Sequence, residues 1–262
     1  MQKKAQVTIF ILIAVILIAS VILFFVFKSN PTDAEILSSS DPAYIFLSSC
    51  LEQTSENALS ALGWQGGLIN FSEERMMITY FSTITYAYDE TAENPKTLPR
   101  LEEMENELET YVNFEFKNCL ENKDALQGWE VKNGEIKTDV FSTDDSVMFN
   151  IDSPLTLTKN QTAHRIKKLH VEIPVRLSYL HYVISDIVDV QVNMPGWVPF
   201  TYLNEFDVNV TFYPYRENNF IYEFTDEKSV IDNEPYRFLV ANRWKERSEE
   251  EINKMLEDLG EH

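Results

Sequence analysis

The feature that most constrains this chain is an unbroken apolar stretch near its N-terminus, Val7 to Phe27. It contains 21 consecutive residues without a charge, and only Thr8 and Ser20 have polar side chains. As a helix it would extend about 31 Å, which matches the hydrocarbon core of a bilayer. A helix that is apolar on every face does not fit the surface of a water-soluble domain. The sequence therefore predicts a leader at residues 1–6, a transmembrane helix at residues 7–28 and the lipid bilayer as a partner.

The distribution of charge predicts the orientation of this helix. Lys3 and Lys4 precede it, and the first 28 residues contain no Asp or Glu, whereas the whole chain has a net charge of −20. Because positively charged flanks stay in the cytoplasm, we expect a single-pass protein of the cell membrane with a cytoplasmic N-terminus and an extracellular C-terminal domain. The acidic balance argues against nucleic acid as a partner.

Two other interpretations of the N-terminus start from the same residues. A cleaved secretory signal would have a shorter apolar region followed by small residues, and FFVFKSNP contains no such site. The leader Lys3-Lys4-Ala5-Gln6-Val7-Thr8, followed by an apolar helix, resembles the class III signal peptide of archaeal type IV pilin-like proteins. That resemblance implies cleavage between Ala5 and Gln6 and self-association through the N-terminal helix. Phe10 departs from the family, which commonly has Glu at this position.

Residues 29–127 are predicted to form a subdomain of helices and strand. Asp41-Pro42 is typical of a helix start, and Gly63 is expected to end this helix in a left-handed conformation. The run from Leu68 to Tyr88 is rich in Ile, Thr, Tyr and Phe, which indicates strand. A second helix is expected from Leu101 to Cys119. Its glutamates are predicted to form a solvated face: Glu102, Glu103, Glu105, Glu107 and Glu109.

The two cysteines of the chain, Cys50 and Cys119, each lie on the apolar side of a predicted helix. In an extracellular setting such a pair favours a disulfide, which would join the two helices. Two free buried thiols are the alternative interpretation.

Residues 128–262 are predicted to form a mainly antiparallel β subdomain with a C-terminal helix. Lys132-Asn133-Gly134-Glu135 is the commonest signal for a two-residue hairpin turn. Alternating apolar residues indicate a strand at 169–177, and helical spacing returns at 178–192. Three later strands read as an antiparallel meander, and a capping box at Ser248 precedes the last helix. The predicted fold class is therefore α+β, with an N-terminal transmembrane helix followed by helices packed on antiparallel sheet.

Few candidate sites emerge from the sequence. Three acceptor triplets for N-linked glycan begin at Asn70, Asn160 and Asn209. The nearest approach to a metal cluster is His170, His181, Asp186 and Asp189, which we interpret as surface residues because they straddle a change from strand to helix. No catalytic, phosphate-binding or dinucleotide motif is present, so no cofactor and no enzymatic activity are expected.

The ectodomain also carries a second resemblance. Cys50-Leu51-Glu52, followed by Leu62-Gly63-Trp64-Gln65-Gly66-Gly67, is similar to uncharacterised membrane-anchored archaeal proteins, and this resemblance implies no activity. Taken together, these features predict a cell-surface protein with a structural or adhesive role. A pilin-like subunit is one form that this role could take. A membrane-tethered binding module for an extracellular ligand or another envelope protein is the alternative, and an exported hydrolase with an unfamiliar site ranks third.

Overall fold

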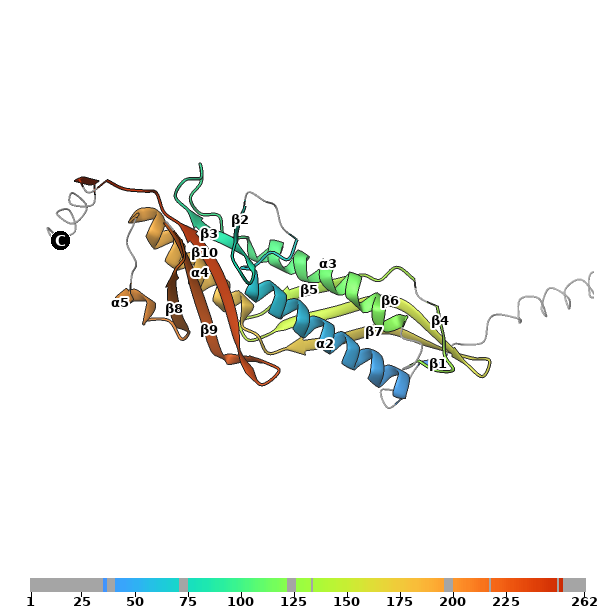
Figure 1. Cartoon of the computed structure of the whole chain (residues 1–262). Helices are drawn as coiled ribbons and strands as arrows, with labels where there is room; N and C mark the ends of the chain where they lie inside the picture. The colour runs from blue at the N-terminus through green and yellow to red at the C-terminus, as the bar shows by residue number, and fades with distance from the viewer. Residues whose placement is uncertain are drawn as a thin grey trace, which may run out of the picture.

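The computed structural model describes residues 35–36, 41–70, 75–121, 126–132, 134–195, 200–216, 218–248 and 250–251. Two five-stranded sheets and the helices packed on them make up these residues (Figure 1). The larger of two buried clusters runs through both sheets and contains residues of α2, α3 and α4, so the two sheets share a core.

The first sheet has the strand order β1-β7-β6-β4, with β5 also paired to β6. Its strands are β1 (Glu35–Ile36), β4 (Glu130–Lys132), β5 (Thr138–Ser142), β6 (Val147–Lys159) and β7 (Thr162–Ile173). Helices α2 (Pro42–Trp64) and α3 (Leu101–Leu120) pack against each other and lie against β7 and β5, respectively (Figure 1).

The second sheet has the strand order β2-β3-β10-β9-β8. Its strands are β2 (Met76–Ile78), β3 (Thr83–Asp89), β8 (Asn209–Pro214), β9 (Asn219–Ile231) and β10 (Glu234–Arg243). The last three form the predicted antiparallel meander. Helix α4 (Leu177–Asn193) lies against β3, and the short α5 (Phe200–Leu203) follows it.

The predicted fold class needs correction in two respects. Among the helices of the residues described above, none is long and apolar enough to cross a membrane, and the predicted span Val7–Phe27 lies outside those residues. The sheets are also mixed, because β1 pairs with β7 in parallel and β3 pairs with β10 in parallel. No hairpin joins β3 to β10, so their connection does not impose an antiparallel arrangement.

Each sheet takes strands from both sides of residue 128. Strands β2 and β3 come from the predicted subdomain of residues 29–127, and β3 pairs with β10 from the C-terminal part. Strand β1 likewise joins strands that follow residue 128. The order of the chain therefore does not correspond to the division between the two sheets.

Helix α2 begins as its sequence predicts but ends differently. The carboxylate of Asp41 accepts a hydrogen bond from the amide of Ala43 at 2.9 Å, and Pro42 occupies the first helical position. Gly63 lies inside the helix, and the left-handed residues are Gly66 and Gly67. A Cβ at Gly63 would stand 2.3 Å from the carbonyl oxygen of Arg237 in β10. Glycine is therefore required at Gly63 by a close helix–strand approach.

The prediction that the glutamates of α3 form a solvated face is wrong for Glu105 and Glu109. Glu105 accepts the amide of Ser142 at 2.7 Å and Glu109 accepts that of Val140 at 3.0 Å, both from edge strand β5. Asn113 accepts the amide of Thr138 one turn later, at 2.9 Å. The spacing of four residues along the helix thus matches the spacing of two along the strand. These side chains cover an edge that would otherwise be open to another chain.

The predicted hairpin at 132–135 is also wrong. Strands β4 and β5 both pair with β6, at opposite ends of it, and not with each other. The shift in register lies between Asp152 and Leu155 of β6, beside Pro154. A Cβ at Gly134 would stand 3.0 Å from Pro154, so this glycine passes close to the irregular part of β6. Residue 133 lies outside the described residues.

The start of helix α4 is fixed by a buried ion pair. Arg176 donates to both carboxylate oxygens of Asp226, at 2.9 and 2.6 Å, and Ser229 donates to the same carboxylate. Burial alone would raise the pKa of Asp226, but these hydrogen bonds outweigh it and lower the pKa. The pair connects α4 to the irregular segment of β9 between Asp226 and Val230.

The C-terminal helix predicted after Ser248 lies outside the described residues, apart from its first turn. The predicted capping box is present there, since the amide of Ser248 donates to Glu251 at 2.8 Å and the amide of Glu251 donates to the Ser248 hydroxyl at 3.3 Å.

Candidate functional site

The most exposed aromatic side chains of the described residues lie in the turn between β2 and β3. Phe81 is 99% exposed, Tyr80 is 81% exposed and Ile78 beside them is 68% exposed. The turn is held in shape from within, because the amide of Thr79 donates to the carbonyl of Ser82 at 2.9 Å and the amides of Phe81 and Ser82 donate to the Thr79 hydroxyl. The exposed rings are therefore presented by an ordered turn.

A second segment, following β8, extends this exposed surface. The Tyr215 hydroxyl lies 3.5 Å from the carbonyl oxygen of Ile78, and its ring is 6.5 Å from that of Tyr80. The Arg216 guanidinium lies over both tyrosine rings, at 5.7 and 5.4 Å from their centroids. We call Ile78, Tyr80, Phe81, Tyr215 and Arg216 the aromatic surface.

The aromatic surface rests on a small core of its own. Leu239 and Ala241 alternate along β10 with residues of the main core, so they face the opposite side of the second sheet. They form a separate buried cluster together with Met77, Ile84 and Tyr86, and Tyr215 packs against it. This buried base gives the exposed rings a fixed position on the sheet.

A pocket of about 370 Å³ lies at the neighbouring end of α2. It is lined by Ser60, Trp64, Ile231, Asp232, Glu234, Pro235, Tyr236 and Arg237. The Ser82 hydroxyl donates to the carbonyl oxygen of Trp64 at 3.2 Å, which links the pocket to the turn that carries Tyr80 and Phe81. The indole of Trp64 is about half exposed and offers a further aromatic contact.

Charged and hydroxyl groups accompany this part of the second sheet. The Tyr213 hydroxyl donates to Glu223 at 3.0 Å, and this hydrogen bond is the main cause of a raised pKa of Tyr213. The other carboxylate oxygen of Glu223 lies 3.7 Å from Arg237, which also lines the pocket. The arrangement combines aromatic rings and arginines, which are residue types enriched in protein interfaces.

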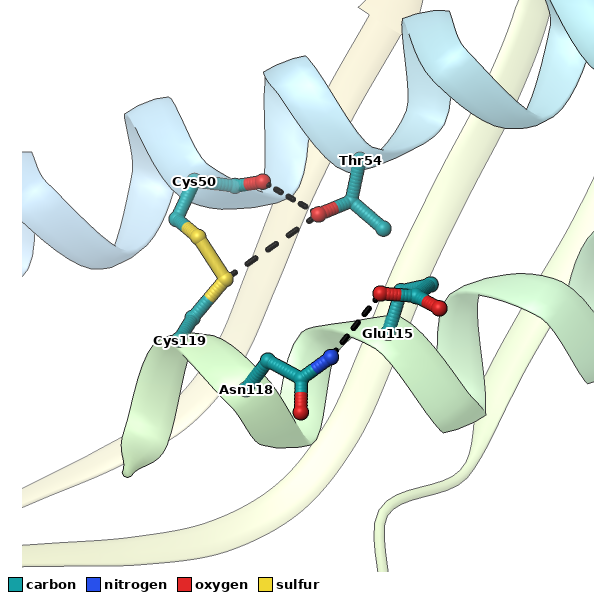
Figure 2. The surroundings of a disulfide bond; sticks show 5 residues. All are labelled: Cys50, Thr54, Glu115, Asn118 and Cys119. Atoms are coloured by element: carbon teal, nitrogen blue, oxygen red, sulfur yellow. Dashed lines mark hydrogen bonds between the residues drawn. A yellow bond between two sulfur atoms is a disulfide. The ribbon is translucent and has the colours of Figure 1, made fainter. Parts of the chain in front are cut away.

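The predicted disulfide agrees with the structure. Cys50 and Cys119 are bonded, with their Cα atoms 6.2 Å apart and one cysteine on each helix (Figure 2). The Thr54 hydroxyl donates to the carbonyl oxygen of Cys50 at 2.7 Å and lies 4.0 Å from the sulfur of Cys119. The bond joins α2 to α3, which lie against β7 and β5 of the first sheet, whereas the aromatic surface is on the second sheet.

The residues considered for metal binding are not brought together as ligands. His170 on β7 contacts Asn150 at 2.8 Å, whereas His181 on α4 contacts the carbonyl oxygen of Pro99 at 3.0 Å. Burial lowers the pKa of His181. Asp189 pairs with Lys96 at 2.7 Å, and Asp186 accepts the hydroxyl of Tyr202. Within the described ranges, no group of three or more His, Cys, Asp or Glu side chains could hold a metal ion.

The remaining predicted sites are distributed over the molecule. Asn70, Asn160 and Asn209 are all exposed, in a loop, a hairpin turn and strand β8. The predicted cleavage site between Ala5 and Gln6 lies outside the described residues.

Sequence reasoning missed the aromatic surface because it assigned all of Leu68–Tyr88 to strand. A signal was present: Tyr80 and Phe81 are adjacent, so in a strand they would point to opposite faces, and polar Thr79 and Ser82 flank them. Comparisons with protein-family models, curated proteins and solved structures give no match for this chain.

Proposed function

We propose that this chain is a non-enzymatic binding protein of the cell surface, which attaches to another protein of the cell envelope through the aromatic surface. The observation that carries the proposal is the exposure of Tyr80 and Phe81 on an ordered turn, beside Arg216. Monomeric soluble proteins seldom expose neighbouring large apolar groups without a partner.

The residue types of the aromatic surface support a protein as the partner. Tyrosine, phenylalanine and arginine are enriched in protein interfaces, and tyrosine and arginine are frequent among the residues that contribute most of the binding energy. The net charge of −20 disfavours anionic partners such as nucleic acid. The disulfide between Cys50 and Cys119 supports an extracytoplasmic location, because such bonds persist in oxidising compartments.

The test is site-specific photocrosslinking of the full-length chain in its own cells. A photoreactive residue in place of Phe81 is expected to give an adduct with one envelope protein. The matched control is Phe114, which is 68% exposed and lies on α3, the helix that packs against β5 of the first sheet, and it is expected to give none.

The affinity for the captured protein is then measured with the double variant Tyr80→Ala/Phe81→Ala. If both rings are central contacts and each contributes about 2 kcal/mol, the dissociation constant rises about 700-fold in the double variant, whereas Phe114→Ala leaves it unchanged. Equal crosslinking at both positions, or none at Phe81, would contradict the proposal. An adduct between two copies of this chain would show that the aromatic surface mediates self-association and not attachment to another envelope protein.

A further inference from the structure

The three acceptor triplets are alike in sequence but differ in their structural surroundings. Transfer of a glycan requires the asparagine side chain, and the Ser or Thr two residues later, to be reached by an enzyme. It also requires open space for the attached sugars. These requirements distinguish between acceptors that a sequence motif cannot separate.

Asn160 meets the requirements. Asn160 and Gln161 form the two-residue turn between β6 and β7, with φ values of 51° and 68°. The side chains of Asn160 and of Thr162, the third residue of the triplet, are both exposed. The strands next to the turn pair in register, from Lys159 with Thr162 to Leu155 with Ile166. The Lys159 ammonium group also lies 5.0 Å from the centroid of the Trp129 ring. Asn160 is therefore at the tip of a regularly paired hairpin.

The other two asparagines are already engaged. The Asn70 side-chain amide donates to Glu107 at 3.2 Å, and the backbone amides of Ile69 and Asn70 donate to the same carboxylate oxygen at 3.0 and 2.7 Å. The Asn209 amide donates to Glu227 at 3.1 Å, within the paired strand β8. Glycosylation would replace one of the two hydrogens on the side-chain amide nitrogen of either residue and place the sugar against the carboxylate that this amide contacts.

We propose that Asn160 is an N-glycosylation site and that Asn70 and Asn209 remain unmodified. The proposal rests on the extracytoplasmic location in the proposed function. The donor would be a lipid-linked oligosaccharide phosphate or diphosphate. The amide nitrogen of Asn160 attacks the anomeric carbon and forms the new C–N bond. The bond from that carbon to the phosphate oxygen breaks, the lipid phosphate leaves with the electron pair, and one amide proton is lost to a base.

The position of the hairpin is compatible with binding through the aromatic surface. The β6–β7 turn lies at the end of the first sheet that is remote from the second sheet (Figure 1). The aromatic surface is on β2, β3 and the segment after β8, in the second sheet. A glycan on Asn160 would shield one end of the molecule from proteases and leave the aromatic surface open.

The test is peptide mass spectrometry of the full-length chain purified from cells that export it and carry out N-glycosylation. The peptide containing Asn160 is expected to carry added sugar mass, while the peptides with Asn70 and Asn209 have their unmodified masses. Asn160→Asp, which tolerates left-handed backbone, is expected to abolish the added mass, as is Thr162→Ala. Thr162→Ser retains it, and so do the matched controls Asn70→Gln and Asn209→Gln.

In the same samples, the oxidation state of Cys50 and Cys119 shows whether the chain was in an oxidising compartment. A chain with Cys50 and Cys119 bonded but with Asn160 unmodified would overturn this inference and leave the proposed function intact. Sugar on Asn70 or Asn209 in place of Asn160 would also overturn it. Free thiols together with three unmodified asparagines would overturn the extracytoplasmic location, and with it both proposals.

Discussion

At the scale of single residues, several side chains have roles that their type alone does not indicate. Glu105 and Glu109 serve as acceptors for a strand edge, although their spacing resembles that of a solvated helix face. Gly63 looks like a helix terminator, yet it is helical and allows α2 to touch β10. In each case the neighbour that sets the role is distant in the sequence.

Gly63→Ala gives a prediction in which two effects have opposite signs. Helix propensity alone would stabilise α2 by about 1 kcal/mol on this substitution. The new Cβ would instead meet the Arg237 carbonyl oxygen at 2.3 Å and the Tyr236 hydroxyl at 2.9 Å. We therefore expect a loss of about 2–3 kcal/mol in the free energy of unfolding, measured by denaturant titration. Asn57→Ala on the exposed face of α2 is the control and should change it by less than about 0.5 kcal/mol. A more stable Gly63→Ala protein would show that α2 can move away from β10.

At the scale of elements, amphipathic pattern identified the helices well, whereas pairing of strands was harder to predict. The apolar stripes of α2, α3 and α4 are buried as expected. Strand β5, however, pairs with β6 and its outer amides bond to α3, so the hairpin signal at 132–135 was misleading. Side chains of α3 therefore protect the edge of the sheet at β5.

Glu109→Ala tests this edge protection. The amide of Val140 would lose its acceptor, so we expect a loss of about 1–2 kcal/mol in the free energy of unfolding. Alanine has at least the helix propensity of glutamate, so this loss would not come from the helix itself. Glu109→Gln retains an acceptor oxygen and should lose less. Glu102→Ala, at an exposed position of the same helix, is the control. Hydrogen exchange at Val140 reports the effect locally, and unchanged protection there would count against the contact.

Across the whole molecule, the disulfide joins two cysteines that lie 69 residues apart in sequence, on helices that pack against each other. The continuous core already links these helices to both sheets. The bond should therefore add stability chiefly by restricting the unfolded chain.

The double variant Cys50→Ala/Cys119→Ala is expected to remain folded but to lose about 4 kcal/mol in the chain-entropy model. For a chain of this size the corresponding drop in Tm is on the order of 10 °C. Thermal unfolding followed by circular dichroism, compared with the oxidised and the reduced wild type, measures it. Identical transitions for the oxidised and reduced proteins would rule out this stabilising role.

Local signals in the sequence are enough to predict several elements: the cap and apolar stripe of α2, the stripe of α4, the meander β8–β10, and one cysteine on the apolar side of each of two helices. Three other features follow from contacts between distant segments: β3 lies parallel to β10, glutamates of α3 cover β5, and Tyr80 and Phe81 project from a turn. The physical reason is that periodicity and capping depend on neighbours within a few residues. Strand order, edge cover and exposure depend on which distant segments meet, and no local pattern encodes that.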